Sequence, residues 1–234
     1  MATPYLEVRD LHGWYGESHV LHGVDFHVGE GEVVTLLGRN GAGRTSTLRA
    51  IMGLIGARKG SVKVRGNETL ALPTHRIARL GLGYCPEERG IFSSLSAEEN
   101  LMLPPPLGPN GMSLDKIYAM FPNLKERAAS QGTRLSGGEQ QMLAVARILR
   151  TGARLLLLDE ISEGLAPVIV EKLGTVVRAL REEGYTIVMV EQNFGFAAAL
   201  ADRFFVMEHG RVAMQFAQSE LAANMEMLHE FLGV

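Results

Sequence analysis

A short apolar run passes directly into a glycine-rich turn at Val33-Val34-Thr35-Leu36-Leu37-Gly38-Arg39-Asn40-Gly41-Ala42-Gly43-Arg44-Thr45. Such a run is typical of a strand buried on both faces, and residues 44–54 read as a helix. The turn nearly matches the pattern of Gly, four residues, Gly-Lys-Ser/Thr. Glycines let backbone N–H groups turn inward around phosphate oxygens, and the helix N-terminus adds a favourable dipole. The segment therefore predicts a phosphate-binding turn; the alternative is a glycine-rich turn without a ligand.

The predicted contacts with phosphate and metal fall on this turn and the first helical residues. Thr45 can place its hydroxyl on Mg²⁺. Arg44 departs from the pattern, which has Lys there. Arg keeps the positive charge, but its planar guanidinium reaches phosphates differently from an ammonium. The residues expected to bind nucleotide here are Gly38, Arg39, Asn40, Gly41, Ala42, Gly43, Arg44, Thr45 and Ser46.

Two acids follow a second apolar run, Leu155-Leu156-Leu157-Leu158-Asp159-Glu160. Asp159 at the end of a strand can hold Mg²⁺, directly or through water. Glu160 can act as the base for a water that attacks the γ-phosphate. The alternative is a surface turn with two solvated acids. We favour the functional interpretation because ligands bind outside the C-terminal ends of parallel strands.

The remaining pattern alternates strands with helices, which implies a parallel sheet with right-handed crossovers. Further expected strands are Arg154–Leu158, Tyr185–Val190 and Arg203–Met207, with helices at 167–183 and 193–201. The N-terminal part and residues 60–66 read as a smaller antiparallel sheet, and residues 218–232 as a closing amphipathic helix. Residues 88–153 read as a helical insertion, interrupted by a proline-rich loop at Leu103–Gly111.

Composition excludes several classes of protein. The chain has 234 residues, 46% hydrophobic and 21% charged, which is typical of a globular domain. The 23 Lys+Arg against 26 Asp+Glu argue against a polybasic nucleic-acid binder. The single Cys85 suits a reducing compartment. No apolar run approaches the about 18 residues of a membrane span, and residues 1–7 do not have the pattern of a secretory signal. Any membrane role is therefore expected to come through a partner.

A third motif, Leu135-Ser136-Gly137-Gly138-Glu139-Gln140-Gln141, begins another predicted helix. Ser136 with Glu139 three residues on reads as a capping box, and the local alternative is an ordinary capped helix. In this order, with the glycine-rich turn before it and the acid pair after it, the motif resembles the signature of the ATP-binding cassette (ABC) family.

The resemblance covers essentially the whole chain and implies a P-loop NTPase (RecA-like) α/β fold in one domain, 1–234. Its core is expected at 1–87 and 154–234, and its helical subdomain at 88–153. By the same resemblance, Tyr15 stacks on adenine; the alternative is an ordinary edge-strand aromatic. The family works as a head-to-tail dimer, which implies that Ser136, Gly137 and Gly138 contact the partner's nucleotide and that the loop Ser162–Pro167 crosses the dimer interface.

More closely, the chain is similar to the smaller ATPase of branched-chain amino-acid importers at Gly38–Gly41, Ile91–Leu101, Glu163–Pro167 and Val190–Asn193. That resemblance implies a second ATPase subunit, two transmembrane permeases, a periplasmic binding protein and a place at the cytoplasmic face of the membrane. Relatives of this kind also carry urea or short amides, so these cargoes stay open.

Three residues depart from the wider ABC pattern. Besides Arg44, Glu87 stands where most members have a Gln that senses Mg²⁺ and the γ-phosphate, and Gln192 stands where many have His. Glu can still ligate Mg²⁺, and Gln can donate a hydrogen bond but carries no charge. These departures leave a second hypothesis open, a weakly hydrolysing subunit paired with an active cassette. A third hypothesis is a cassette that acts on DNA or ribosomes. Such proteins usually carry long coiled coils or tandem cassettes, and this sequence shows neither pattern.

Overall fold

The computed structural model describes residues 3–108 and 111–232. At its centre lies a six-stranded sheet of order β10-β9-β3-β8-β7-β6. All neighbouring pairs are parallel except β9 and β10, which are antiparallel. The strands are β3 (Val33–Leu37), β6 (Leu82–Cys85), β7 (Leu155–Asp159), β8 (Thr186–Val190), β9 (Arg203–Glu208) and β10 (Arg211–Ala217). The expectation of a mostly parallel sheet is therefore confirmed.

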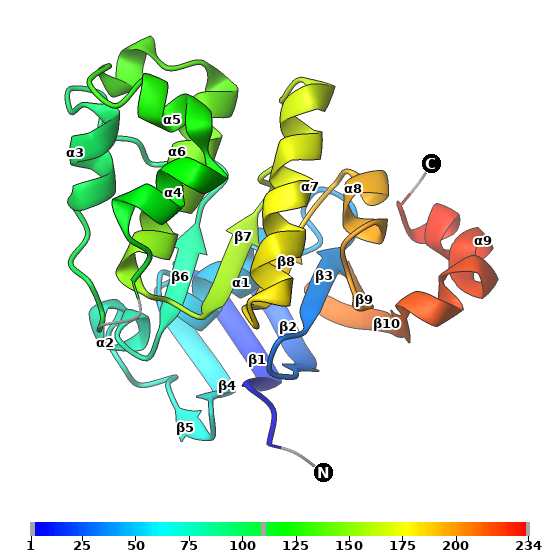
Figure 1. Ribbon diagram of the computed structural model, residues 1–234. Coiled ribbons are helices and arrows are strands. Elements are labelled where there is room, and N and C mark those ends of the chain that lie inside the picture. The colour runs from blue at the N-terminus through cyan, green and yellow to red at the C-terminus, as the bar shows by residue number, and fades with distance from the viewer. Residues whose placement is uncertain (1–2, 109–110, 233–234) are drawn as a thin grey trace.

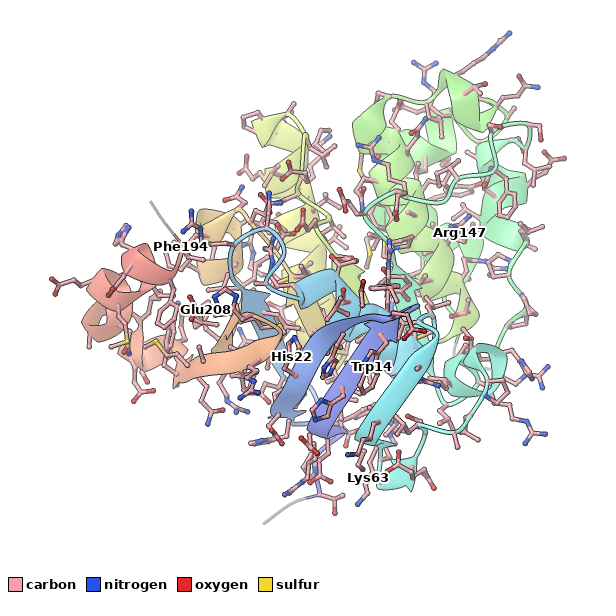
Figure 2. The ribbon with its side chains drawn as sticks, turned by 180° about the vertical axis from the view of Figure 1, so that it is seen from behind. Trp14, His22, Lys63, Arg147, Phe194 and Glu208 are labelled. Atoms are coloured by element: carbon pink, nitrogen blue, oxygen red, sulfur yellow. The ribbon has the colours of Figure 1, made fainter. Side chains whose placement is uncertain are left out.

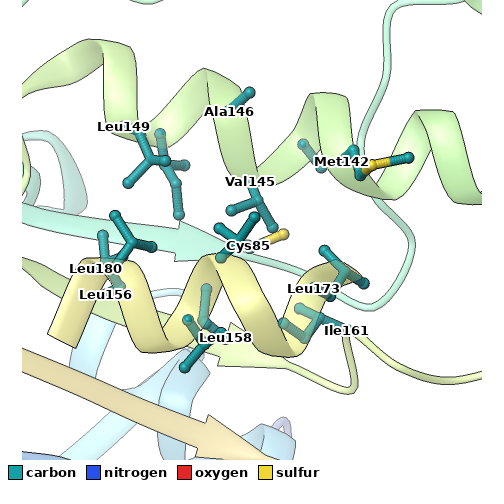
Figure 3. Packing of buried hydrophobic residues seen from close by; sticks show 14 of the residues in the cluster. Cys85, Met142, Val145, Ala146, Leu149, Leu156, Leu158, Ile161, Leu173 and Leu180 are labelled. Atoms are coloured by element: carbon teal, nitrogen blue, oxygen red, sulfur yellow. The ribbon is translucent and has the colours of Figure 1, made fainter. Parts of the chain in front are cut away.

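Alternate side chains of the central strands enter two different cores, which is why the apolar runs are continuous. Leu156 and Leu158 of β7 pack with helices α6 (Gly137–Thr151) and α7 (Pro167–Glu182), as Figure 3 shows. Leu155 and Leu157 point to the opposite face and pack with helix α1 (Arg44–Met52). The result is a sheet covered on both faces.

A second, antiparallel sheet of order β2-β1-β4-β5 forms the other layer of the core (Figure 1). Its strands are β1 (Leu6–Tyr15), β2 (Ser18–Val28), β4 (Ala57–Val64) and β5 (Asn67–Glu68). Its inward residues, among them Leu11 and Leu21, are fully buried in the same cluster as Leu48 of α1. The sequence predicted this smaller sheet from the N-terminal part and residues 60–66, and β4 includes most of that range.

Figure 1 shows the helices α3 to α6 gathered to one side of the sheets. They are α3 (Ala97–Met102), α4 (Leu114–Met120), α5 (Pro122–Glu126) and α6, with the short helix η1 (Gly132–Arg134) between the last two. The side chains of Ser96 and Ser113 cap α3 and α4 by accepting backbone N–H groups. Described residues of the proline-rich loop carry no helix, and Pro109 and Asn110 of that prediction lie outside the described residues. The subdomain bounds at 88 and 153 stay a prediction.

Two expected helices are shorter in the structure. The helix expected at 44–54 ends at Met52, because Gly53 adopts the left-handed conformation (φ 73°) and closes it. The helix expected at 193–201 is α8 (Phe194–Ala198) alone, since the N–H of Asp202 already donates to the carbonyl of Val33 and leads into β9. The other helices are α2 (Thr74–Ala78), η2 (Gln218–Glu220) and α9 (Leu221–Leu232). Within the described part of the chain, no helix combines the length and the apolar character that a membrane span requires.

Candidate functional site

The glycine-rich turn lies at the C-terminal end of β3 and passes into α1. Gly38, Gly41 and Gly43 have positive φ values of 149°, 82° and 100°, which side chains rarely adopt. At Gly38 a Cβ atom would stand 2.4 Å from the carbonyl oxygen of Met207, so β9 also excludes a side chain. The N–H of Gly210 donates to the carbonyl of Ala42 (3.0 Å) and ties the turn to the β9–β10 connection. These contacts with β9 and the β9–β10 connection hold the turn in place.

A cavity of about 400 Å³ opens against this turn. Its walls come from five segments that are far apart in the sequence: Val20 of β2, residues 40–46, Glu87, Glu160 and Gln192. The last three follow β6, β7 and β8, so the cavity lies at the C-terminal ends of adjacent parallel strands. That is the place where open α/β sheets bind ligands.

Arg44 is buried at the floor of the site and makes three hydrogen bonds. Its Nη2 lies 3.0 Å from Oε1 of Glu160 and 3.3 Å from Oδ1 of Asn40, and its Nη1 donates to the carbonyl oxygen of Glu191 (2.8 Å). Burial lowers the pKa of the guanidinium, and the carboxylates of Glu160, Asp159 and Glu191 oppose that effect. The forked side chain therefore joins the phosphate turn to two other loops through separate nitrogens, a planar geometry that an ammonium does not have.

Thr45 and Asp159 meet directly beneath the turn, where Oγ1 of Thr45 donates to Oδ1 of Asp159 (2.9 Å). The other carboxylate oxygen accepts from the hydroxyl of Tyr84 (2.9 Å). Burial raises the pKa of Asp159, and the bonds from Tyr84 and Thr45 counteract it. A hydroxyl and a carboxylate side by side form the hard-oxygen donor set that Mg²⁺ takes, since this ion needs only one or two protein ligands beside phosphates. The residues present fit the metal.

Glu160 is held in an unusual backbone conformation, with φ 48°. Its carboxylate accepts from Arg44 on one oxygen and from Nε2 of Gln192 on the other (2.9 Å). Its N–H donates to the carbonyl of Val190 (2.8 Å). Burial raises the pKa of this carboxyl above its usual value, and Arg44 and Gln192 lower it in turn. A non-glycine residue with positive φ that is held from several sides is a common feature of functional sites.

The structure thus brings Arg44, Thr45, Asp159, Glu160 and Gln192 together, as the sequence led us to expect. Glu87 is exposed and also forms part of the cavity wall. Two other sets lie apart. Tyr15 is at the end of β1, 40% exposed, and is not among the residues lining the cavity. Ser136, Gly137 and Gly138 begin α6, where Ser136 and Glu139 form the expected capping box, and they are not part of the cavity wall either.

Two contacts were not anticipated from the sequence. Tyr84 donates its hydroxyl to Asp159 because β6 and β7 are paired in parallel, with Tyr84 beside Leu157. Glu191 is 1% exposed, and its carboxylate accepts from the hydroxyl and the N–H of Ser162. A polar residue between an apolar strand and Gln192 was the available signal, but its partner lies 29 residues away in the sequence.

A parallel sheet with a glycine-rich phosphate turn, and acids at the same edge, defines an ATPase of the P-loop class. A model of the ABC transporter family matches residues 21–163, and the chain belongs to this family. The chain is 41% identical over 223 residues to the high-affinity branched-chain amino acid transport ATP-binding protein BraG of Pseudomonas aeruginosa, which covers 94% of this chain and 96% of that protein. ABC ATP-binding cassettes bind and hydrolyse ATP, function as dimers and, in transporters, serve transmembrane permeases.

Two further relatives are informative about the range of the family. A probable branched-chain amino acid transport ATP-binding protein LivF of Archaeoglobus fulgidus is 34% identical over 92% of this chain and 93% of its own. The lipopolysaccharide export system ATP-binding protein LptB of Escherichia coli is 29% identical over 100% and 98%. Among solved structures, one titled as the ATP binding subunit of an ABC transporter matches with a TM-score of 0.81, at 27% identity over 99% and 100% of the two chains.

Proposed function

We propose that this chain binds Mg·ATP at the turn Gly38–Ser46, hydrolyses it with Glu160 as the base, and powers membrane import of branched-chain amino acids through partner permeases. One observation carries the nucleotide part: beside the cavity, the phosphate turn contacts the end of β7, through Thr45–Asp159 at 2.9 Å and Arg44–Glu160 at 3.0 Å. The cargo part is supported by the names of the relatives BraG and LivF.

In this proposal the phosphate chain lies against the backbone N–H groups of residues 38–46, at the start of α1. Arg44 turns part of its guanidinium to the β- and γ-phosphates. Thr45 and Asp159, with Glu87 as a further ligand, would hold Mg²⁺, and the metal would neutralise charge on the phosphate oxygens. Tyr15 covers the adenine with its exposed ring.

Glu160 has the position and surroundings of a general base. Its two oxygens are oriented by Arg44 and Gln192, so the carboxylate has a fixed direction toward the cavity. A raised pKa makes the carboxylate a stronger base, which suits the acceptance of a proton from water. Gln192 holds this carboxylate and adds a donor for the γ-phosphate. Catalysis in this class depends on positioning and charge, and these contacts supply both.

The proposed assembly contains a second ATPase subunit, two transmembrane permeases and, indirectly, a periplasmic binding protein. Ser136, Gly137 and Gly138 then contact the nucleotide of the partner cassette, and the partner's corresponding residues contact the nucleotide of this chain. The chain is held at the cytoplasmic face of the membrane by the permeases. Nucleic acid is not among the proposed partners.

The cargo is tested in proteoliposomes that hold the chain with its permeases, the second ATPase and the binding protein. We expect ATP-dependent uptake of leucine, isoleucine and valine, and none of urea or acetamide. Uptake of urea or acetamide without the amino acids would instead support the alternative cargo of the same machine. The same vesicles assayed without ATP report background leakage.

A second candidate function is a nucleotide-binding subunit that hydrolyses weakly and closes on an active partner. One observation favours it: Arg44, in the place of Lys, pairs directly with the proposed base Glu160. The two candidates separate when Glu160→Gln is placed in this chain only. Unchanged cargo uptake means that hydrolysis here is dispensable, whereas a large loss means that this site works.

A further inference from the structure

The strongest unassigned feature near the site is the buried carboxylate of Glu191. It is 1% exposed and is not among the residues that line the cavity. Oε2 accepts from the hydroxyl of Ser162 (2.6 Å) and Oε1 accepts from the N–H of the same residue (3.2 Å). A buried acid is costly unless it is hydrogen-bonded, so a two-point attachment to one serine indicates a defined role.

These contacts form part of a closed ring. From Ser162 the chain runs back two residues to Glu160, whose carboxylate binds Nη2 of Arg44. Nη1 of the same guanidinium donates to the carbonyl oxygen of Glu191 (2.8 Å), and the carboxylate of Glu191 accepts from Ser162, which closes the ring. Inside the ring, Nε2 of Gln192 also donates a hydrogen bond to Glu160. All the atoms of the ring are thus connected through hydrogen bonds or covalent chain.

On one side the ring continues into an exposed loop. Ser162 is buried, but the next residues, Glu163 and Gly164, are exposed and belong to the loop that the family resemblance assigns to the dimer interface. On the other side of the ring Arg44 belongs to the phosphate turn. Glu191 therefore stands between a loop that a partner subunit would touch and a cation that a phosphate would touch.

We propose that Glu191 is a positioning residue that couples the loop Ser162–Pro167 to Arg44 and Gln192, so that nucleotide contact at the turn is transmitted to the loop. This inference rests on the proposed function. Glu191 acts only through other groups: its carboxylate holds Ser162 and its carbonyl holds Arg44. When phosphate draws the guanidinium away from Glu160, the anchor at Glu191 limits the movement and passes it to Ser162.

The test follows the loop directly by ¹⁹F NMR in the full-length chain. Glu163→Cys places a thiol on the exposed part of the loop, and a trifluoromethyl reagent labels it. Cys85 is fully buried, and burial raises the pKa of its thiol to about 12, so it stays unlabelled. Mg·ATP is titrated into the labelled chain, and the titration reports both the displacement of the resonance and the dissociation constant.

We expect Mg·ATP to displace the resonance when Glu191 is present. Adding Glu191→Ala reduces the displacement by about fivefold or more, while the dissociation constant changes by less than about threefold. Glu191→Gln restores at least half of it, because its carbonyl can accept from the Ser162 N–H and its amide can donate to the hydroxyl. Glu182→Gln, the same change at an exposed position at the end of α7, leaves the displacement unchanged.

Ser162→Ala removes only the hydroxyl and decides the question if Glu191→Ala fails to fold; we expect a smaller displacement there too. The proposal is wrong if the chain binds Mg·ATP and the resonance does not move, or if it moves equally with Glu191→Ala or Ser162→Ala. If the unlabelled native chain does not bind Mg·ATP, the proposed function itself fails, and this inference falls with it.

Discussion

Arg44 of the phosphate turn and Glu160 after β7 form a buried ion pair, with 3.0 Å between Nη2 and Oε1 and side chains only 4% and 7% exposed. The residue that replaces the usual Lys thus binds the carboxylate that we propose as the base. A bound phosphate would compete with Glu160 for the same guanidinium. Removing one partner of a buried ion pair leaves an unpaired charge and strongly destabilises the folded protein. Conservative variants are therefore the informative ones.

Arg44→Lys is expected to lower stability more than nucleotide affinity. The guanidinium holds Glu160 and the Glu191 carbonyl through two separate nitrogens, and a compact ammonium does not reproduce that planar fork. We expect the free energy of unfolding to fall by about 1–3 kcal/mol and the dissociation constant of Mg·ATP to change by less than about fivefold. Urea unfolding and nucleotide titration measure the two. Arg178→Lys, the same change on an exposed face of α7, is the control; equal stability of both variants would contradict the account.

Glu160→Gln is expected to keep nucleotide binding and remove turnover. The amide has nearly the shape of the carboxyl group but does not take a proton from water, so ATP hydrolysis should fall by about 10²- to 10⁴-fold. Phosphate release by the chain with its partner cassette measures this. A variant that hydrolyses ATP at the native rate would show that Glu160 is not the base. Glu182→Gln controls for the loss of one negative charge.

Tyr84→Phe is expected to weaken the metal site. The phenol hydroxyl donates to Oδ2 of Asp159, and groups that orient a metal-ligating carboxylate tune its affinity. We expect the Mg²⁺ concentration for half-maximal ATPase activity to rise by about tenfold. Tyr118→Phe, which removes a hydroxyl bound to Glu98 in α3, should leave it unchanged. An identical Mg²⁺ requirement in both variants would exclude Tyr84 from this role.

Glu191 is expected to make stability depend on pH. Burial raises its pKa from the usual value of 4.5 to about 7, despite the hydrogen bonds from Ser162. Between these values the folded chain retains a proton that the unfolded chain has released, so the free energy of unfolding falls as pH rises through this interval. Glu191→Gln lacks this loss. Relative to the native chain it should gain up to about 3 kcal/mol between pH 4.5 and 8, measured by urea unfolding. A difference independent of pH would refute this.

Much of the fold could be predicted because its signals are local. The strand before the phosphate turn is β3, with the expected bounds Val33–Leu37, since a run of four apolar residues and Thr35 ends at Gly38, whose positive φ favours a turn. The capping box at Ser136 likewise marks the start of α6. Helix ends were less accurate: α8 stops early because Ala199–Asp202 must turn into β9, a constraint from the sheet that helix propensity does not contain.

The convergence of four candidate residues was predictable from the sequence, but the contacts between them were not. Motifs placed Arg44, Thr45, Asp159 and Glu160 near one another, because their strands end at the same edge of the sheet. No motif indicated that Arg44 would bind Glu160 and Glu191 together, or that Tyr84 would hold Asp159. Those contacts depend on the pairing of β6, β7 and β8 and on side-chain directions, which come from the assembled sheet.

Titration calorimetry of the purified chain with Mg·ATP tests the central claim most directly. The account predicts one nucleotide per chain, and it predicts that Gly38→Ala abolishes the binding heat if the variant remains folded by circular dichroism, because a Cβ there meets the Met207 carbonyl and displaces the turn. Gly184→Ala, at another positive φ but with open space around it, controls for backbone strain and should bind normally. A folded native chain that takes up no Mg·ATP, alone or with its companion cassette, would contradict the account.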